Sequence, residues 1–168
     1  SAIEHHATLH TAEALAKRGF ALTILPVDGQ GRISPADLSN AIRPDTGLVS
    51  IMLVNNEVGS LQDIPALARI ARERDALFHT DAAQSVGKIP VSVQDLGVDL
   101  LSVAGHKVYA PKGVGSLYIR PGLVLEPLLH GAGHEVLVQV AEGQLAQGAS
   151  DARLLAPANL QLERLVGS

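Results

Sequence analysis

The sequence predicts an α/β fold, a three-layer sandwich in which helices cover both faces of a mostly parallel β-sheet. Segments with apolar residues at helical spacing alternate along the chain with short, continuous apolar runs. Continuous runs of strand length are typical of strands that are covered on both faces. The alternation of strands with helices favours parallel strands joined by helical crossovers. We find no internal repeat and no low-complexity linker.

The first part of the chain is expected to form two helices with a strand between them. The segment "HATLHTAEALAKRG" has apolar residues at helical spacing and a basic last turn, and it stops at Gly19. The segment "ALTILPV", residues 21–27, is predicted to be a strand that Pro26 interrupts. In "SPADLSNAIR", Ser34 is suited to the N-cap and Pro35 to the first helical position.

The remainder of the chain continues the alternation. A helix is expected from Asp63, as its cap, through Arg74. The strands are predicted in "GLVSIMLV", "ALFHTD", "VDLLSVAG" and "GSLYIR". The last of these, at about residues 116–120, follows its predecessor too closely for a helical crossover, so we expect it to be antiparallel.

Composition restricts the classes of function. A chain of 168 residues fits one domain with a substantial core. Its formal net charge is -4 and it contains no basic block, which argues against nucleic-acid and anionic-membrane partners. It has no cysteine, so it contains no disulfide, thiolate metal site or cysteine nucleophile. Without an apolar run of membrane length or a signal-peptide pattern, a soluble, cytoplasmic protein is expected.

Polar side chains follow three of the predicted strands. These are Asn55 and Asn56, then Asp81, and then the pair His106 and Lys107. In parallel sheets, ligands bind at the carboxyl ends of the strands. We therefore expect these three clusters to converge on one edge of the sheet.

The residue types at this edge suit pyridoxal 5'-phosphate. The aldehyde of that cofactor needs a lysine amine for a Schiff base, and its pyridine nitrogen needs a carboxylate that keeps it protonated. Lys107 and Asp81 are the candidates for these two roles. Gln84, on the turn that follows Asp81, is placed to donate to the phenolic oxygen of the ring.

Longer stretches of the chain carry a resemblance to a known family. They are "EHHA", "RPDTGLVSIMLVNNEVGSLQDI", "FHTDAAQSVGKIPV", "LGVDLLSVAGHKVYAPKGVGSLYIR" and "LEPLLHGAGHE". In order and spacing, from Ile3 to Glu135, the chain resembles the large domain of the cysteine desulfurases. These belong to the class-V aminotransferase group of fold-type-I pyridoxal-phosphate transferases.

The resemblance implies further roles for individual residues. Lys107 would form the Schiff base with the cofactor and, once released, would act as the base that deprotonates the amino-acid substrate. His5 would stack on the pyridine ring, and His106 would contact the phosphate. Asn56 would lie beside the cofactor and the substrate carboxylate. The substrate in that family is L-cysteine.

The sequence departs from the family pattern in four respects. Ala104 replaces a serine that usually donates to the phosphate, so cofactor binding is expected to be weaker. The family's early phosphate loop and its later catalytic cysteine are both absent, so desulfuration is not expected to be completed. Residues 1–135 are accordingly interpreted as a partial large domain. Residues 136–168 are interpreted as a tail outside the family, helical in part, which a frameshift or fusion would explain.

Two other classes of function stay open. One is a non-catalytic folded remnant or protein-interaction domain, whose uncovered sheet edges favour a homo-oligomer, with a dimer as the expected state. The other is a metal-binding protein, because His6 and His10, and again His130 and His134, have i, i+4 spacing. We expect His79 to be packed or hydrogen-bonded in the core.

Overall fold

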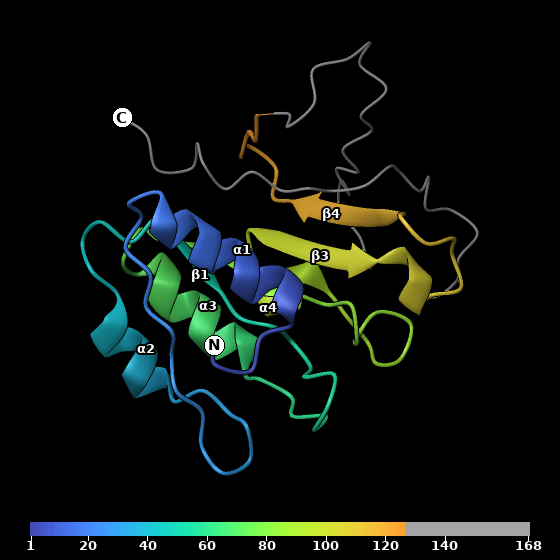
Figure 1. Ribbon diagram of the computed structural model, residues 1–168, viewed down its shortest axis with the longest axis horizontal. Helices are drawn as coiled ribbons and strands as arrows, with labels where there is room; N and C mark the ends of the chain where they lie inside the picture. Colours follow the sequence, from blue (N-terminus) through green and yellow to red (C-terminus); the bar gives the residue numbers. More distant parts are fainter. Residues whose placement is uncertain (127–168) are drawn as a thin grey trace.

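A four-stranded sheet lies at the centre of the molecule (Figure 1). The structure is a computed structural model that describes residues 1–126. The strands run in the order β1-β2-β3-β4, with β1, β2 and β3 parallel and β4 antiparallel to β3. Their bounds are Leu48–Ser50, Leu77–Asp81, Leu100–Ala104 and Gly115–Ile119. The predicted α/β class, with a mostly parallel sheet and an antiparallel last strand, is confirmed.

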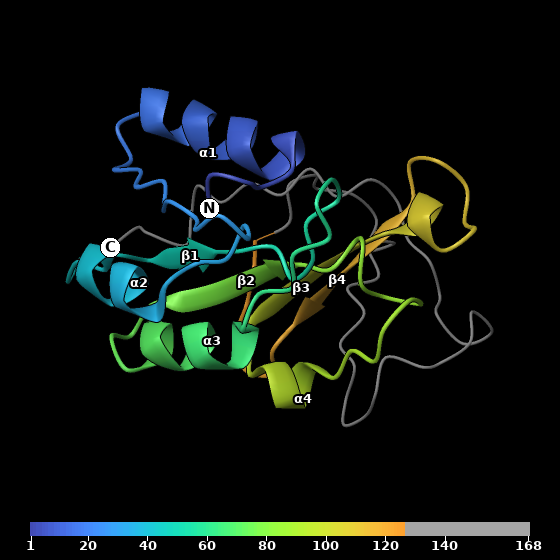
Figure 2. The ribbon, with the colours of Figure 1, turned by 90° about the horizontal axis from the view of Figure 1, so that it is seen from below.

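Helices cover both faces of this sheet, as Figure 2 shows. Helix α1, His6–Lys17, lies over one face. Helices α3, Ile64–Arg72, and α4, Val93–Leu96, lie over the other face. Helix α2, Pro35–Ala41, packs against α3. The helices thus form the two outer layers that the sequence predicts.

The two faces are covered unequally. Phe78 and Leu101 of the sheet, and Ile51 directly after β1, pack with Ile64 and Leu67 of α3 in one continuous core. None of the residues of α1 is buried. The core therefore lies between the sheet and α3, while the opposite face carries a more polar set of side chains.

The helix starts follow the capping residues. Ser34 Oγ accepts a hydrogen bond from the backbone N–H of Asp37, and Asp63 Oδ1 accepts one from that of Ala66. Both expected N-caps are confirmed, although α3 ends at Arg72 and not at Arg74. The short helix α4 was not among the elements expected from the sequence.

Some expectations differ from the structure. Residues 21–27 form no strand; the segment receives one backbone hydrogen bond, from Ala2 N to Leu25 O, among the described residues. β1 is shorter than the expected run, yet the N–H groups of Ile51 and Leu53 still donate to the carbonyls of His79 and Asp81. The predicted tail, 136–168, lies outside the described residues. Within the described part of the chain, no helix is long and apolar enough to cross a membrane.

Candidate functional site

The topology brings the predicted site segments to one edge of the sheet. Because β1, β2 and β3 are parallel neighbours, their carboxyl ends meet at the same edge. Asp81 is the last residue of β2 and pairs in register with Ser102 of β3. Lys107 ends the 3-10 helix Gly105–Lys107 that follows β3 directly. The three polar clusters therefore follow the carboxyl ends of three neighbouring parallel strands.

Asp81 has one carboxylate oxygen engaged and one available. Its Oδ1 accepts a hydrogen bond of 2.8 Å from the backbone N–H of Ala83, which fixes the turn after β2. Among the described residues, Oδ2 has no hydrogen-bond partner. The side chain is half-buried at the end of the strand. Oδ2 can therefore accept a hydrogen bond from a protonated ring nitrogen while Oδ1 keeps its bond to the Ala83 N–H.

Gln84 is arranged as a hydrogen-bond donor. Its Oε1 accepts a hydrogen bond from the ammonium group of Lys88, four residues later in the sequence. The amide oxygen is thus occupied, and the NH₂ group has no hydrogen-bond acceptor within residues 1–126, so it can donate. This polarity suits a phenolic oxygen as the partner of Gln84.

In the segment around Lys107, the backbone is closely packed at Gly105, whereas the side chains of His106 and Lys107 are exposed. The N–H of Gly105 donates to the carbonyl of Val114 at 2.9 Å, and a Cβ at Gly105 would lie 2.5 Å from that oxygen. His106 and Lys107 themselves are exposed. The glycine therefore holds the loop against the start of β4 and leaves the lysine amine accessible.

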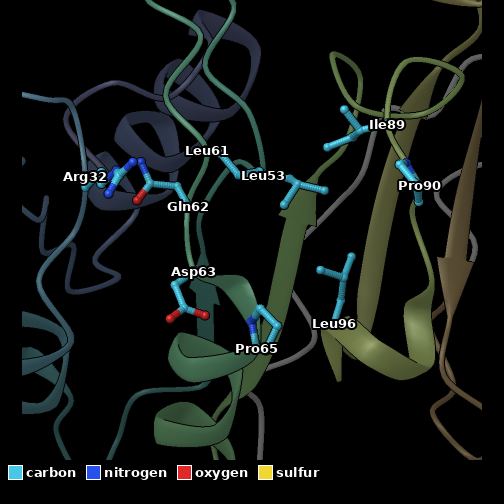
Figure 3. Close-up of a pocket in the computed structure, with 9 residues that line it drawn as sticks. All are labelled: Arg32, Leu53, Leu61, Gln62, Asp63, Pro65, Ile89, Pro90 and Leu96. Carbon is cyan, nitrogen blue, oxygen red and sulfur yellow. The ribbon is translucent and has the colours of Figure 1, made fainter.

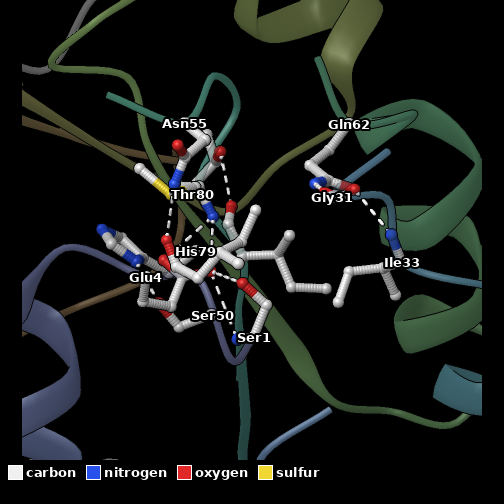
Figure 4. A network of polar contacts seen from close by, with 12 residues as sticks. Ser1, Glu4, Gly31, Ile33, Ser50, Asn55, Gln62, His79 and Thr80 are labelled. Carbon is white, nitrogen blue, oxygen red and sulfur yellow. Dashed lines mark hydrogen bonds and ion pairs between the residues drawn. The ribbon is translucent and has the colours of Figure 1, made fainter. Parts of the chain in front are cut away.

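His5 lies at the start of α1, where its Nδ1 accepts a hydrogen bond of 3.2 Å from the N–H of Ala7. Two neighbouring contacts join this helix start to the segment after β1 (Figure 4). The buried carboxylate of Glu4 accepts the N–H of Met52 at 3.0 Å. Asn55 Nδ2 donates to the carbonyl of Ile3 at 2.8 Å. These contacts hold the backbone just before His5 against the segment that follows β1.

The two asparagines after β1 differ in their surroundings. Asn55 is buried, and its Oδ1 accepts the N–H groups of Glu57 and Val58. Asn56 is exposed on the same turn. Asn55 therefore forms the turn, and Asn56 keeps its side chain available. The sequence alone predicts no separate role for Glu4 or Asn55. The one hint it contains is that Glu4 adjoins His5 and Asn55 adjoins Asn56.

His79 is buried between two serines of the neighbouring strands. Its Nδ1 lies 2.8 Å from Ser50 Oγ, and its Nε2 lies 2.8 Å from Ser102 Oγ. Burial lowers the pKa of His79 to about 4, although the negative charge of Asp81 acts in the opposite direction. The expectation of a hydrogen-bonded core histidine is confirmed, and the ring is neutral at pH 7.

The histidine pair that suggested a metal site lies on α1. The rings of His6 and His10 stack with centroids 5.0 Å apart. Within residues 1–126, no group of three or more histidine, cysteine, aspartate or glutamate side chains could hold a metal ion. His130 and His134 lie outside the described residues.

A separate pocket of about 450 Å³ lies beside the start of α3 (Figure 3). Its lining is mostly apolar and includes Leu53, Leu61 and Ile89, and Arg32 is the only cation among the lining residues. The carboxylate of Asp63 there caps α3. None of the predicted site residues lines this pocket, so it does not compete with the sheet edge as a place for their chemistry.

The fold and the site segments together define a member of the class-V aminotransferases. The family model described as "Aminotransferase class-V" matches residues 1–151, past the expected boundary at Glu135. The chain belongs to this family. Members of the family depend on pyridoxal phosphate.

Within the family, the chain is similar to cysteine desulfurases. It is 55% identical over 135 residues to "Cysteine desulfurase IscS" of Dictyoglomus turgidum. The matched region is 80% of this chain and 34% of that protein. The protein of the same name in Methanosarcina thermophila is 53% identical, with 80% and 33% covered. The chain thus spans about a third of the length of the curated relatives it matches.

Solved structures agree with this placement. A "NIFS-LIKE PROTEIN" superposes with a TM-score of 0.75 at 44% identity, covering 79% of this chain and 37% of that one. The structure "SspA in complex with cysteine" gives a TM-score of 0.77 at 44% identity, with 85% and 42% covered.

Proposed function

We propose that this chain carries part of a pyridoxal-phosphate site of the cysteine-desulfurase type and forms a Schiff base through Lys107. The observation that carries the proposal is the joint placement of Asp81 and Lys107 at the carboxyl ends of neighbouring parallel strands. When bound, the cofactor supplies an electron sink for activating an amino acid. L-cysteine is the proposed substrate because the relatives are cysteine desulfurases.

The residues present fit this cofactor. Asp81 Oδ2 is available to hold the ring nitrogen protonated, and the Gln84 NH₂ group is available to the ring oxygen. His5 begins α1 and is available to stack on the ring, and His106 and Asn56 are exposed after the ends of β3 and β1. Lys107, once free of the cofactor, would take the proton from the substrate Cα.

For these 168 residues, the proposal is limited to the activation of an amino acid. These 168 residues include no cysteine, so no thiol within them can accept sulfur as a persulfide. Ala104 has no hydroxyl with which to hold the phosphate. We therefore propose amino-acid activation as the chemistry that this chain retains.

Borohydride trapping tests the proposal. The chain is incubated with pyridoxal phosphate, reduced and digested, and the modified peptide is identified by mass. We expect a phosphopyridoxyl adduct on Lys107. Lys112→Arg is the matched control, because Lys112 is an exposed lysine in the same loop, and it should leave the adduct unchanged. An adduct spread over surface lysines, or none at all, would contradict the proposal.

A further inference from the structure

We propose that His79 is a positioning residue for Asp81, acting through a hydrogen-bonded bridge from Ser50 to His79 to Ser102. This inference rests on the proposed function, because it concerns how the carboxylate is aimed at the cofactor's ring nitrogen. The bridge crosses three neighbouring strands, β1, β2 and β3. It lies immediately before the carboxyl end of β2.

The bridge is complete on both sides of the imidazole. Each ring nitrogen lies 2.8 Å from a serine hydroxyl, and His79 is buried. Figure 4 shows the Ser50 side of this bridge. A hydroxyl both donates and accepts, so the two serines satisfy a neutral imidazole in either tautomer. The ring is therefore held at two points, which fixes its orientation.

Strand register connects this bridge to Asp81. Side chains two residues apart on a strand share a face, so His79 and Asp81 project from β2 to the same side. His79 is in register with Ser50, and Asp81 is in register with Ser102. Ser102 thus bonds the His79 ring and is also the cross-strand neighbour of Asp81. A shift of Ser102 or of the β2 end would redirect the carboxylate.

The charge state of the bridge suits this role. A neutral imidazole does not compete as a cation for Asp81, so the carboxylate stays available to the ring nitrogen. With Oδ1 held by the N–H of Ala83 and the strand end held by the bridge, Oδ2 keeps a defined direction. His79 itself touches neither cofactor nor substrate in this role.

The test compares two ligands on the full chain. One is pyridoxal phosphate, and the other is its carbon analogue, in which C–H replaces the ring nitrogen. Both can react with Lys107, but only the first has a nitrogen for Asp81. We expect His79→Gln and Ser102→Ala to weaken pyridoxal phosphate binding by about tenfold, the scale of one hydrogen bond to a charged group. Binding of the carbon analogue should change by less than about twofold.

Ser116→Ala on β4 is the matched control, because Ser116 makes no side-chain hydrogen bond among the described residues. It should change neither affinity. In the cofactor-free chain, Ser102→Ala should also shift the ring-nitrogen NMR signals of His79, and Ser116→Ala should not. If His79→Gln does not fold, the affinities of Ser102→Ala for the two ligands are sufficient for the test.

The outcomes separate this inference from the proposed function. An equal loss of both ligands, no loss of either, or unmoved His79 signals would overturn the positioning role alone. Failure of the unsubstituted chain to bind pyridoxal phosphate would overturn the proposed function, and this inference with it.

Discussion

At the scale of single residues, His79 makes stability depend on pH. Its pKa is 6.5 when unfolded and about 4 when folded, because burial disfavours the charged ring. Between these values the unfolded chain binds more protons, so stability rises with pH across the window and is lost as the pH falls from 6.5 towards 4. The difference corresponds to about 3 kcal/mol in the free energy of unfolding. Urea unfolding at a series of pH values measures it.

Two glutamine variants separate this effect from other titrations. His79→Gln cannot take up a proton, so the slope of stability against pH between 4 and 6.5 should flatten. His6→Gln removes an exposed histidine of α1 and should keep the slope of the unsubstituted chain. A slope that persists in His79→Gln would show that another group carries it.

Some residues of the candidate site can be predicted from the sequence, and others are recognised only from their contacts in the structure. Lys107, Asp81 and Gln84 could be inferred because the chemistry of one cofactor needs those groups after strand ends. Glu4 and Asn55 could not, since their importance lies in contacts with residues about fifty positions away in the chain. Asn55 and Asn56 are the same residue type side by side, so only the burial and hydrogen bonds of Asn55 in the structure show that it forms the turn.

At the scale of elements, the loop between β3 and β4 depends on Gly105. A Cβ there would lie 2.5 Å from the Val114 carbonyl oxygen, closer than real contacts allow, so the backbone must shift. We expect Gly105→Ala to lower the free energy of unfolding by about 2 to 3 kcal/mol, as overpacking does. It should also reduce Lys107 trapping. Denaturant unfolding and borohydride trapping measure the two effects.

Gly113 in the same loop is the control. Its φ is +85° and nothing lies within 4 Å of an added Cβ, so Gly113→Ala meets backbone strain without a clash. The expected cost is about 1 to 2 kcal/mol. Equal or reversed costs for the two substitutions would contradict the close approach at Gly105.

The elements that could be predicted are those with local signals. Ser34, Asp63 and the helix periods define their helices without reference to the rest of the chain. The expected strand at 21–27 is wrong because a strand needs a hydrogen-bonded neighbour, which its apolar composition does not reveal. Helix α4 was missed because four residues carry no helical period, although Ser92 caps it by accepting from Asp95 N–H.

At the scale of the whole molecule, the two faces of the sheet differ in how well they are covered. The face under α3 has a continuous core, whereas α1 buries none of its residues over the other face. Leu22 and Ile24 of the segment 21–27, which forms no strand, are 40% and 46% exposed. Exposed apolar side chains on a segment that has no strand neighbour among residues 1–126 favour burial against another chain.

We propose that the chain forms a homodimer through this segment. Sedimentation equilibrium over a range of concentrations should give twice the chain mass of 17.5 kDa. Ile24→Lys should shift the distribution to monomer, because a lysine in place of this exposed isoleucine would bring a charge into the apolar contact. Val124→Lys places the same charge at a site that is 86% exposed and distant in sequence, and it should leave the dimer intact. A monomer at high concentration, or a dimer insensitive to Ile24→Lys, would contradict self-association through 21–27 and leave the exposed apolar residues to a different protein partner.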